Sequence, residues 1–147
     1  MENVLKQLGF DGNIRITPDS KASVLDIIKL AGGQENARVV WARIRNDKYL
    51  VSSSWNRYKF QGQSTDTPVI TVDGLFILIG LIPGKIAQRF RIKCYQTVRR
   101  VMAGDKKLIA EIERNHHIAQ NDSGSAQAFL HKTLNNAENK DCMIPEL

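Results

Sequence analysis

The sequence has few cysteines, and it contains no hydrophobic run long enough to span a membrane. Its two cysteines, Cys94 and Cys142, lie far apart, so they indicate neither a disulfide framework nor a zinc site. The longest apolar stretch, Leu75 to Ile82, is far shorter than the roughly 20 residues of a transmembrane helix. The first residues lack the basic and apolar segments of a signal peptide. We therefore expect an intracellular protein without a membrane partner.

The sequence also lacks a recognisable catalytic or cofactor-binding pattern. His116 and His117 are adjacent, so their side chains diverge on a helix and cannot form a metal-binding pair. No glycine-rich phosphate loop is present. Asp66 and Asp73 offer the oxygen ligands of a metal site, but turn and helix-cap roles explain them better. We therefore expect no enzyme, no metal and no cofactor.

Positive charge is what the sequence has in excess, and it is unevenly distributed. The net charge is +6. Residues 38–104 carry 12 basic and three acidic side chains, whereas the segments before and after them are slightly acidic. A basic centre between acidic ends favours an anionic macromolecule such as nucleic acid over a polybasic membrane anchor.

The hydrophobic pattern predicts a small, helix-rich α+β domain with short strands or a β-hairpin. The expected helices cover residues 23–31, 35–45, 85–102, 105–118 and, with a weaker pattern, 126–136. Ser23 is expected to cap the first of them. A further buried helix is expected to begin after a cap at Thr71 or Asp73 and to end at Leu81. The expected strands lie within residues 13–17, 49–60 and 69–72. We assign residues 1–118 to the domain and residues 119–147 to a C-terminal tail or accessory helix.

The predicted helix over residues 85–102 has two distinct faces. Its apolar stripe, which we expect to be buried, consists of Ala87, Phe90, Cys94, Val98 and Val101. A separate polar stripe consists of Lys85, Arg89, Lys93, Gln96 and Arg100. A helix that buries one face and presents positive charge on another indicates a long anionic partner.

A helix-turn-helix unit is the second candidate for a nucleic-acid contact. The helices over residues 23–31 and 35–45 are separated by Gly32-Gly33 and have suitable lengths. The second helix carries Arg38, Arg43 and Arg45. An ordinary helical hairpin with a solvated basic face is the alternative interpretation.

The third candidate is the polar segment over residues 56–63. Arg57 and Lys59 can neutralise phosphates, while Gln61 and Gln63 can address base edges. The neighbouring aromatic residues Trp55, Tyr58 and Phe60 are expected to pack on the core.

Several short motifs support a DNA-binding function when they are taken in order. They are Ser23–Ile28, Val40–Arg43, Lys59–Gln63, Thr67–Thr71, Leu81–Ala87 and Gly104-Asp105. Together they resemble the Bro-N-type domains of viral and phage-derived proteins, which are related to KilA-N and phage antirepressor domains. The resemblance covers about residues 14–115. It implies a small α+β DNA-binding domain of transcriptional regulators, but it assigns no base-contacting residue.

We therefore expect a non-catalytic protein of the viral or phage regulator type that binds double-stranded DNA. The candidate contacts are Arg38, Arg43, Arg45, Arg57, Lys59, Gln61, Gln63, Lys85, Arg89, Lys93, Gln96 and Arg100. The alternative is an antirepressor-like module that binds an acidic regulator protein. RNA ranks lower, because no aromatic strand motif of the RRM type is present. A homodimer is compatible with the sequence.

Overall fold

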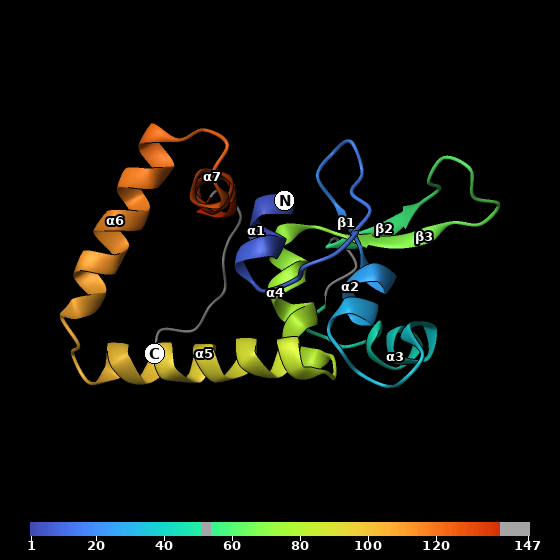
Figure 1. Ribbon diagram of the computed structural model, residues 1–147, viewed down its shortest axis with the longest axis horizontal. Coiled ribbons are helices and arrows are strands. Elements are labelled where there is room, and N and C mark those ends of the chain that lie inside the picture. Colours follow the sequence, from blue (N-terminus) through green and yellow to red (C-terminus); the bar gives the residue numbers. More distant parts are fainter. Residues whose placement is uncertain (51–53, 139–147) are drawn as a thin grey trace.

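The computed structural model describes residues 1–50 and 54–138, which form a helix-rich α+β domain (Figure 1). The helices are α1 (Glu2–Gln7), α2 (Val24–Leu30), α3 (Ala37–Ile44), α4 (Val72–Leu81), α5 (Lys85–Met102), α6 (Lys107–Asn121) and α7 (Ala126–Glu138). The strands are β1 (Ala22–Ser23), β2 (Trp55–Tyr58) and β3 (Thr67–Ile70). The expected fold class is confirmed.

The three strands form one antiparallel sheet in the order β1-β3-β2. Ile70 of the central strand lies opposite Ala22 on one side and Trp55 on the other. The strand expected over residues 13–17 is wrong, since that segment contributes only an isolated bridge between Ile16 and Ala22. Part of the hairpin expected over residues 49–60 lies outside the described residues.

Local side-chain caps explain where three of the helices begin. Ser23 Oγ accepts a hydrogen bond from the backbone N–H of Asp26 at the start of α2. Asn36 and Thr71 accept equivalent bonds at the starts of α3 and α4. Each cap satisfies a backbone donor that the first helical turn leaves without a partner. The expected start of α2 is confirmed, and of the two caps expected for α4 the structure has Thr71 rather than Asp73. Helix α3 starts two residues later than expected.

The core lies between the sheet and helices α2, α3 and α4. Trp41 is buried, and its ring meets that of Trp55 edge-on at a centroid distance of 4.9 Å. The expectation that all three neighbouring aromatic residues pack on the core is wrong. Tyr58 is exposed and packs instead against Phe60, because both lie where the hairpin leaves the domain.

The turn between α4 and α5 is held tightly against the turn between α2 and α3. The backbone N–H of Ile86 donates to the carbonyl of Ala31 over 3.2 Å. Gly84 has φ +119°, and a Cβ atom at this position would overlap the carbonyl oxygen of Ala31. The guanidinium of Arg91 donates to the carbonyl of Ile82 over 2.8 Å. These contacts fix the direction in which α5 leaves the domain.

The second half of α5 extends beyond the domain, away from the sheet (Figure 1). Ala87 is buried and Phe90 is half-buried beside Phe76. The predicted burial of Cys94, Val98 and Val101 is wrong, since all three are exposed. Helix α4 packs only against the first turns of α5, and these three residues lie further along the helix.

Helices α6 and α7 lead the chain back to the domain. Helix α6 continues past its expected end at residue 118 and ends at Asn121. In the following turn, the carbonyl of Gly124 accepts a hydrogen bond from Asn3 Nδ2 over 2.6 Å. Ala126 is part of the core, and α7 packs against α1 and α6. The accessory segment expected from residue 119 therefore contains the end of α6 and a helix, α7, that is docked on the domain. Within the described ranges, no helix is long and apolar enough to cross a membrane.

Candidate nucleic-acid interface

Helix α3 presents free positive charge at both of its ends. Arg38 lies in the first turn and Arg45 caps the C-terminus, and both are exposed. Neither side chain forms an ion pair or hydrogen bond among the described residues. Arg43, by contrast, donates to both carboxylate oxygens of Glu35, over 3.0 and 3.2 Å. These bonds raise the pKa of Arg43 and lower that of Glu35, so this pair contributes no net charge.

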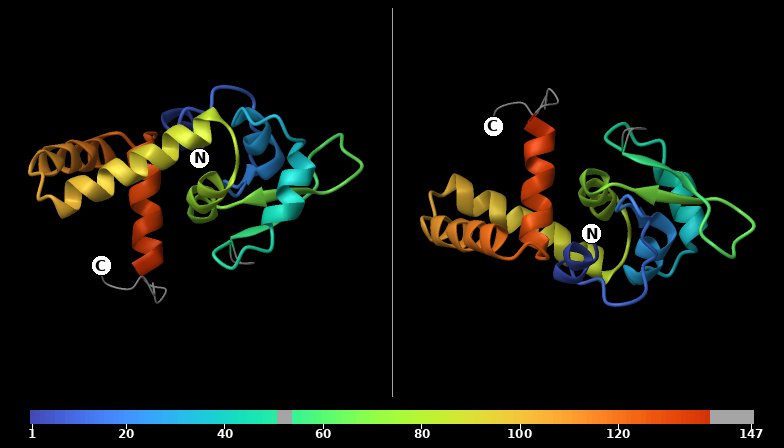
Figure 2. Two further views of the ribbon diagram at one scale, coloured as in Figure 1. Left: turned by 90° about the horizontal axis from the view of Figure 1, so that it is seen from below. Right: turned by 90° about the horizontal axis from the view of Figure 1, so that it is seen from above.

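The β2–β3 hairpin with its loop over residues 59–66, here called the wing, projects from the domain (Figures 1 and 2). Arg57, Lys59 and Gln61 are exposed on it. Gln63 has a partial structural role, since its Oε1 accepts a hydrogen bond from the hydroxyl of Thr67 over 3.1 Å. The side chains of Arg57 and Lys59 make no ion pair within the described chain and are available for an anion.

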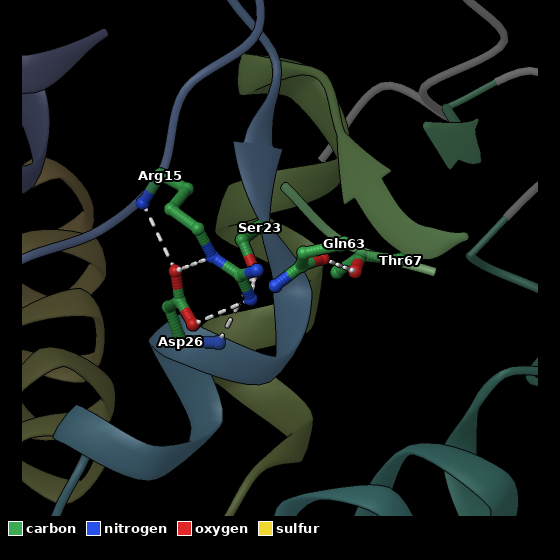
Figure 3. A network of polar contacts seen from close by, with 5 residues as sticks. All are labelled: Arg15, Ser23, Asp26, Gln63 and Thr67. Carbon is green, nitrogen blue, oxygen red and sulfur yellow. Dashed lines mark hydrogen bonds and ion pairs between the residues drawn. The ribbon is translucent and has the colours of Figure 1, made fainter. Parts of the chain in front are cut away.

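Arg15 binds Asp26 and Ser23 at the start of α2, and Gln63 and Thr67 of the wing lie beside it (Figure 3). Arg15 Nε and Nη2 donate to the two carboxylate oxygens of Asp26 over 2.9 and 3.0 Å, and Nη2 also approaches Ser23 Oγ at 3.3 Å. The same guanidinium lies 4.9 Å from the ring centroid of Phe60. One cation therefore joins the wing to the first turn of α2.

Burial and hydrogen bonding act in opposite directions on Asp26. Burial, the largest single influence, raises the pKa of its carboxyl, but the hydrogen bonds from the side chain and backbone of Arg15 together lower it below its usual value. The bond to Asp26 raises the pKa of Arg15. Sequence reasoning missed Arg15, because its partner lies eleven residues away and no periodic pattern connects the two.

The polar stripe of α5 is exposed along its length, with one exception. Lys85, Arg89, Lys93 and Gln96 are exposed, and the three cations form no ion pair within residues 1–50 and 54–138. The neighbouring Arg99, which the sequence-based set omits, is exposed in the same way.

Arg100 is the exception, because two acidic side chains of the chain bind its guanidinium. Its Nε donates to Asp105 over 2.8 Å, and Nη1 and Nη2 donate to Glu111 over 3.0 and 2.8 Å. The bonds to Glu111 and then Asp105 raise the pKa of Arg100. Two carboxylates already occupy the guanidinium, so Arg100 stabilises the corner between α5 and α6.

The candidate residues fall into two groups rather than one patch. Helix α3 and the wing lie at the same end of the molecule, and the first turn of α5 is joined to the α2–α3 turn through Ala31 (Figures 1 and 2). The stripe from Arg89 to Gln96 runs along α5 away from that end.

No group of three or more His, Cys, Asp or Glu side chains that could hold a metal occurs among the residues that the structure describes. The interpretation of the interface therefore rests on its geometry and charge, since comparisons with protein families, with curated proteins and with solved structures find no match.

Proposed function

We propose that the protein binds double-stranded DNA without catalysis, as a transcription regulator does. One observation carries this proposal. The helix pair α2–α3 is followed directly by a basic β-hairpin at the same end of the molecule. The cations Arg38, Arg45, Arg57 and Lys59 are exposed there without an acidic partner in the described chain.

Helix α3 has the position and side chains of a recognition helix. In helix-turn-helix proteins the second helix lies in the major groove, and its N-terminal residues contact base edges. Arg38 lies in that first turn, and Val39 beside it is 57% exposed. An arginine suits the acceptor edge of guanine, and an exposed valine suits the methyl group of thymine. Arg45 at the other end of α3 would then contact the backbone.

The wing supplies a second contact next to the helix pair. Arg57 and Lys59 are placed to neutralise phosphates, and Gln61 in the loop adds an amide that can hydrogen-bond to sugar or base edges. A helix-turn-helix unit with a following hairpin has the arrangement of winged helix-turn-helix domains, which is support by fold analogy. The resemblance of the ordered motifs to Bro-N-type domains favours the same class of ligand.

The test is a fluorescence anisotropy titration of the full chain with duplex DNA, single-stranded DNA and RNA at several salt concentrations. We expect duplex DNA to bind most tightly, with an affinity that falls steeply as salt rises. The variant Arg45→Ala/Arg57→Ala/Lys59→Ala should flatten the slope of log K against log salt by about 0.9 per lost phosphate contact. Lys132→Ala, which removes an exposed cation from α7, is the matched control.

Two results would count against the proposal. An unchanged slope in the triple variant would remove α3 and the wing from the interface. A stoichiometric complex with an acidic regulator protein, together with no affinity for duplex DNA, would favour the antirepressor-like alternative.

A further inference from the structure

The apolar stripe of α5 continues beyond the part of the helix that the domain covers. Ala87 and Phe90 lie against the domain, but Val98 is 49% exposed and Val101 is 63% exposed about two and three turns beyond Phe90. At 100° per residue these positions share one face of the helix. The neighbouring Tyr95 and Met102 are 66% and 83% exposed. A single chain thus leaves half of this stripe uncovered.

Helix α6 adds a second uncovered apolar surface. None of its residues is buried, and Ile109 and Ile112 are 55% and 63% exposed. Asn115 and His116, which follow on the same face of the helix, contact α7. Ile109 and Ile112 therefore lie on the face of α6 that is turned toward α7.

A hollow of about 450 Å³ lies where α6, α7 and α1 meet, and it continues this surface. Its lining includes Ile112 and Ala119 of α6 and Leu130 and Leu134 of α7. The uncovered faces of α5 and α6 and this hollow are here called the arm surface. In Figure 1, α5 and α6 meet at a corner and α7 returns beside α1, so the arm is bent rather than flat.

Nucleic acid does not suit the arm surface. Arg89 and Lys93 lie roughly on the opposite side of α5 from Val98, at 100° per residue. Arg91, a cation close to the apolar stripe, donates to the carbonyls of Ile82 and Ile79. The partner of this surface is therefore apolar, and it is separate from the partner of the basic stripe.

The exposed area matches the contribution of one subunit to a stable dimer. Seven side chains of the arm surface, each 49% or more exposed, present roughly 700 Å² at about 100 Å² each. They are Tyr95, Val98, Val101, Met102, Ile109, Ile112 and Leu134. A standard interface buries about 800 Å² per partner, whereas the largest apolar patch of a typical monomer covers about 300–600 Å².

We propose that the arm surface docks a second copy of this chain and forms a symmetric homodimer. A two-fold interface uses the same surface on both subunits, and an apolar stripe meets this condition because it matches itself. A bent surface can enclose a helix of the second copy, whereas a bilayer would require a flat or convex apolar face. The proposal is independent of DNA binding.

The test is sedimentation equilibrium of the full chain without DNA, from about 1 to 100 µM, because a dimer responds to protomer concentration. We expect a dimer, and we expect Tyr95→Ser to raise its dissociation constant at least tenfold. Tyr49→Ser is the matched control, since both tyrosines are 66% exposed but Tyr49 lies outside the arm. Val98→Asp should give a monomer. If Val98→Asp loses its circular dichroism signal, the two tyrosine variants decide the question.

A wild-type chain that remains monomeric at about 100 µM would overturn the proposal. Equal dissociation constants for Tyr95→Ser and Tyr49→Ser would do so as well. Binding to vesicles of phosphatidylcholine and phosphatidylserine is measured as well. If the protein is monomeric and binds these vesicles through Tyr95, the arm surface faces a membrane and the proposal is wrong. Because no DNA is present, this experiment can fail while the proposed function stands.

Discussion

The guanidinium of Arg15 lies over the ring of Phe60, 4.9 Å from its centroid. The wing thus rests on a side chain from the segment between α1 and β1, and Asp26 holds that side chain in place. The position of a proposed DNA contact depends on an ion pair that need not touch DNA itself.

The first prediction concerns this ion pair. Asp26→Asn should lower the free energy of unfolding at pH 7 by about 1–2 kcal/mol, because it weakens charged hydrogen bonds that are partly shielded from water. The lowered pKa of Asp26 means that its contribution is present above its unfolded-state pKa of about 3.9 and is lost as the pH falls through the folded-state value. Urea unfolding from pH 7 to pH 3 should therefore show the two curves converging below about pH 4.

The control for this prediction is Asp11→Asn, which changes an exposed carboxyl outside the network. Its stability should stay close to that of the parent at every pH. A constant difference between Asp26→Asn and the parent across the whole pH range would contradict the role given to the carboxylate.

The second prediction separates two arginines on α5. Arg89→Ala should flatten the salt slope of DNA binding by about 0.9, because an exposed free cation is lost. Arg100→Ala should leave the slope unchanged, because Asp105 and Glu111 already bind that guanidinium. Arg100→Ala should instead speed backbone hydrogen exchange in the first turns of α6. An equal loss of slope in both variants would return Arg100 to the interface.

The third prediction concerns how far the domain covers α5. Phe90 is half-buried, so Phe90→Ala should cost less than the about 3–5 kcal/mol of a fully buried ring, in the range of about 1–3 kcal/mol. Leu78→Ala in α4 removes a side chain with no exposed surface and should cost about 2–5 kcal/mol. Chemical denaturation checks both values. A larger loss for Phe90→Ala than for Leu78→Ala would show that this part of α5 is more deeply packed.

The fourth prediction compares the same substitution at two glycines near the α4–α5 turn. Gly84→Ala should destabilise the protein by roughly 2 kcal/mol or more, because its φ is positive and the added Cβ would overlap the Ala31 carbonyl. Gly80→Ala should be neutral or stabilising by about 0.5–1 kcal/mol, since Gly80 is helical and a Cβ there meets no atom within 4 Å. Thermal unfolding measures both effects. Similar melting temperatures for the two variants would contradict the close contact between Gly84 and the carbonyl of Ala31.

Local signals predicted much of the fold. Both ends of α5 were predicted correctly, because Pro83-Gly84 stops one helix before it and Gly104 follows its end. The cap at Ser23 was predicted, and Thr71 was one of two candidate caps for α4 beside Asp73, since a helix start depends on a few neighbouring residues. The short sheet was harder to predict, because its pairings join segments far apart in the chain.

The wrong burial predicted for Val98 and the unforeseen ion pairs of Arg100 have a common physical origin. Helical periodicity shows which residues share a face, but it does not show how far along the helix a neighbour extends. Helix α4 has ten residues and α5 has 18. The apolar stripe of α5 therefore extends beyond the part that α4 covers, and Val98 lies beyond that part. The ion pairs of Arg100 were not foreseen, because Asp105 follows in the corner after α5 and Glu111 follows in α6. Glu111 reaches the guanidinium of Arg100 because the chain turns at the corner between α5 and α6.

The contact between Gly84 and Ala31 couples the orientation of α5 to the turn that precedes α3. Helix α5 is about 27 Å long at 1.5 Å per residue, and its first turn is fastened to the turn that precedes α3. A rotation of about 5° at this junction would move the far end of α5 by about 2 Å. A ligand that tilts α3 would therefore displace the arm surface. If such a displacement changes dimer affinity, dimerisation must change ligand affinity by the same factor, because coupling between two binding sites is reciprocal.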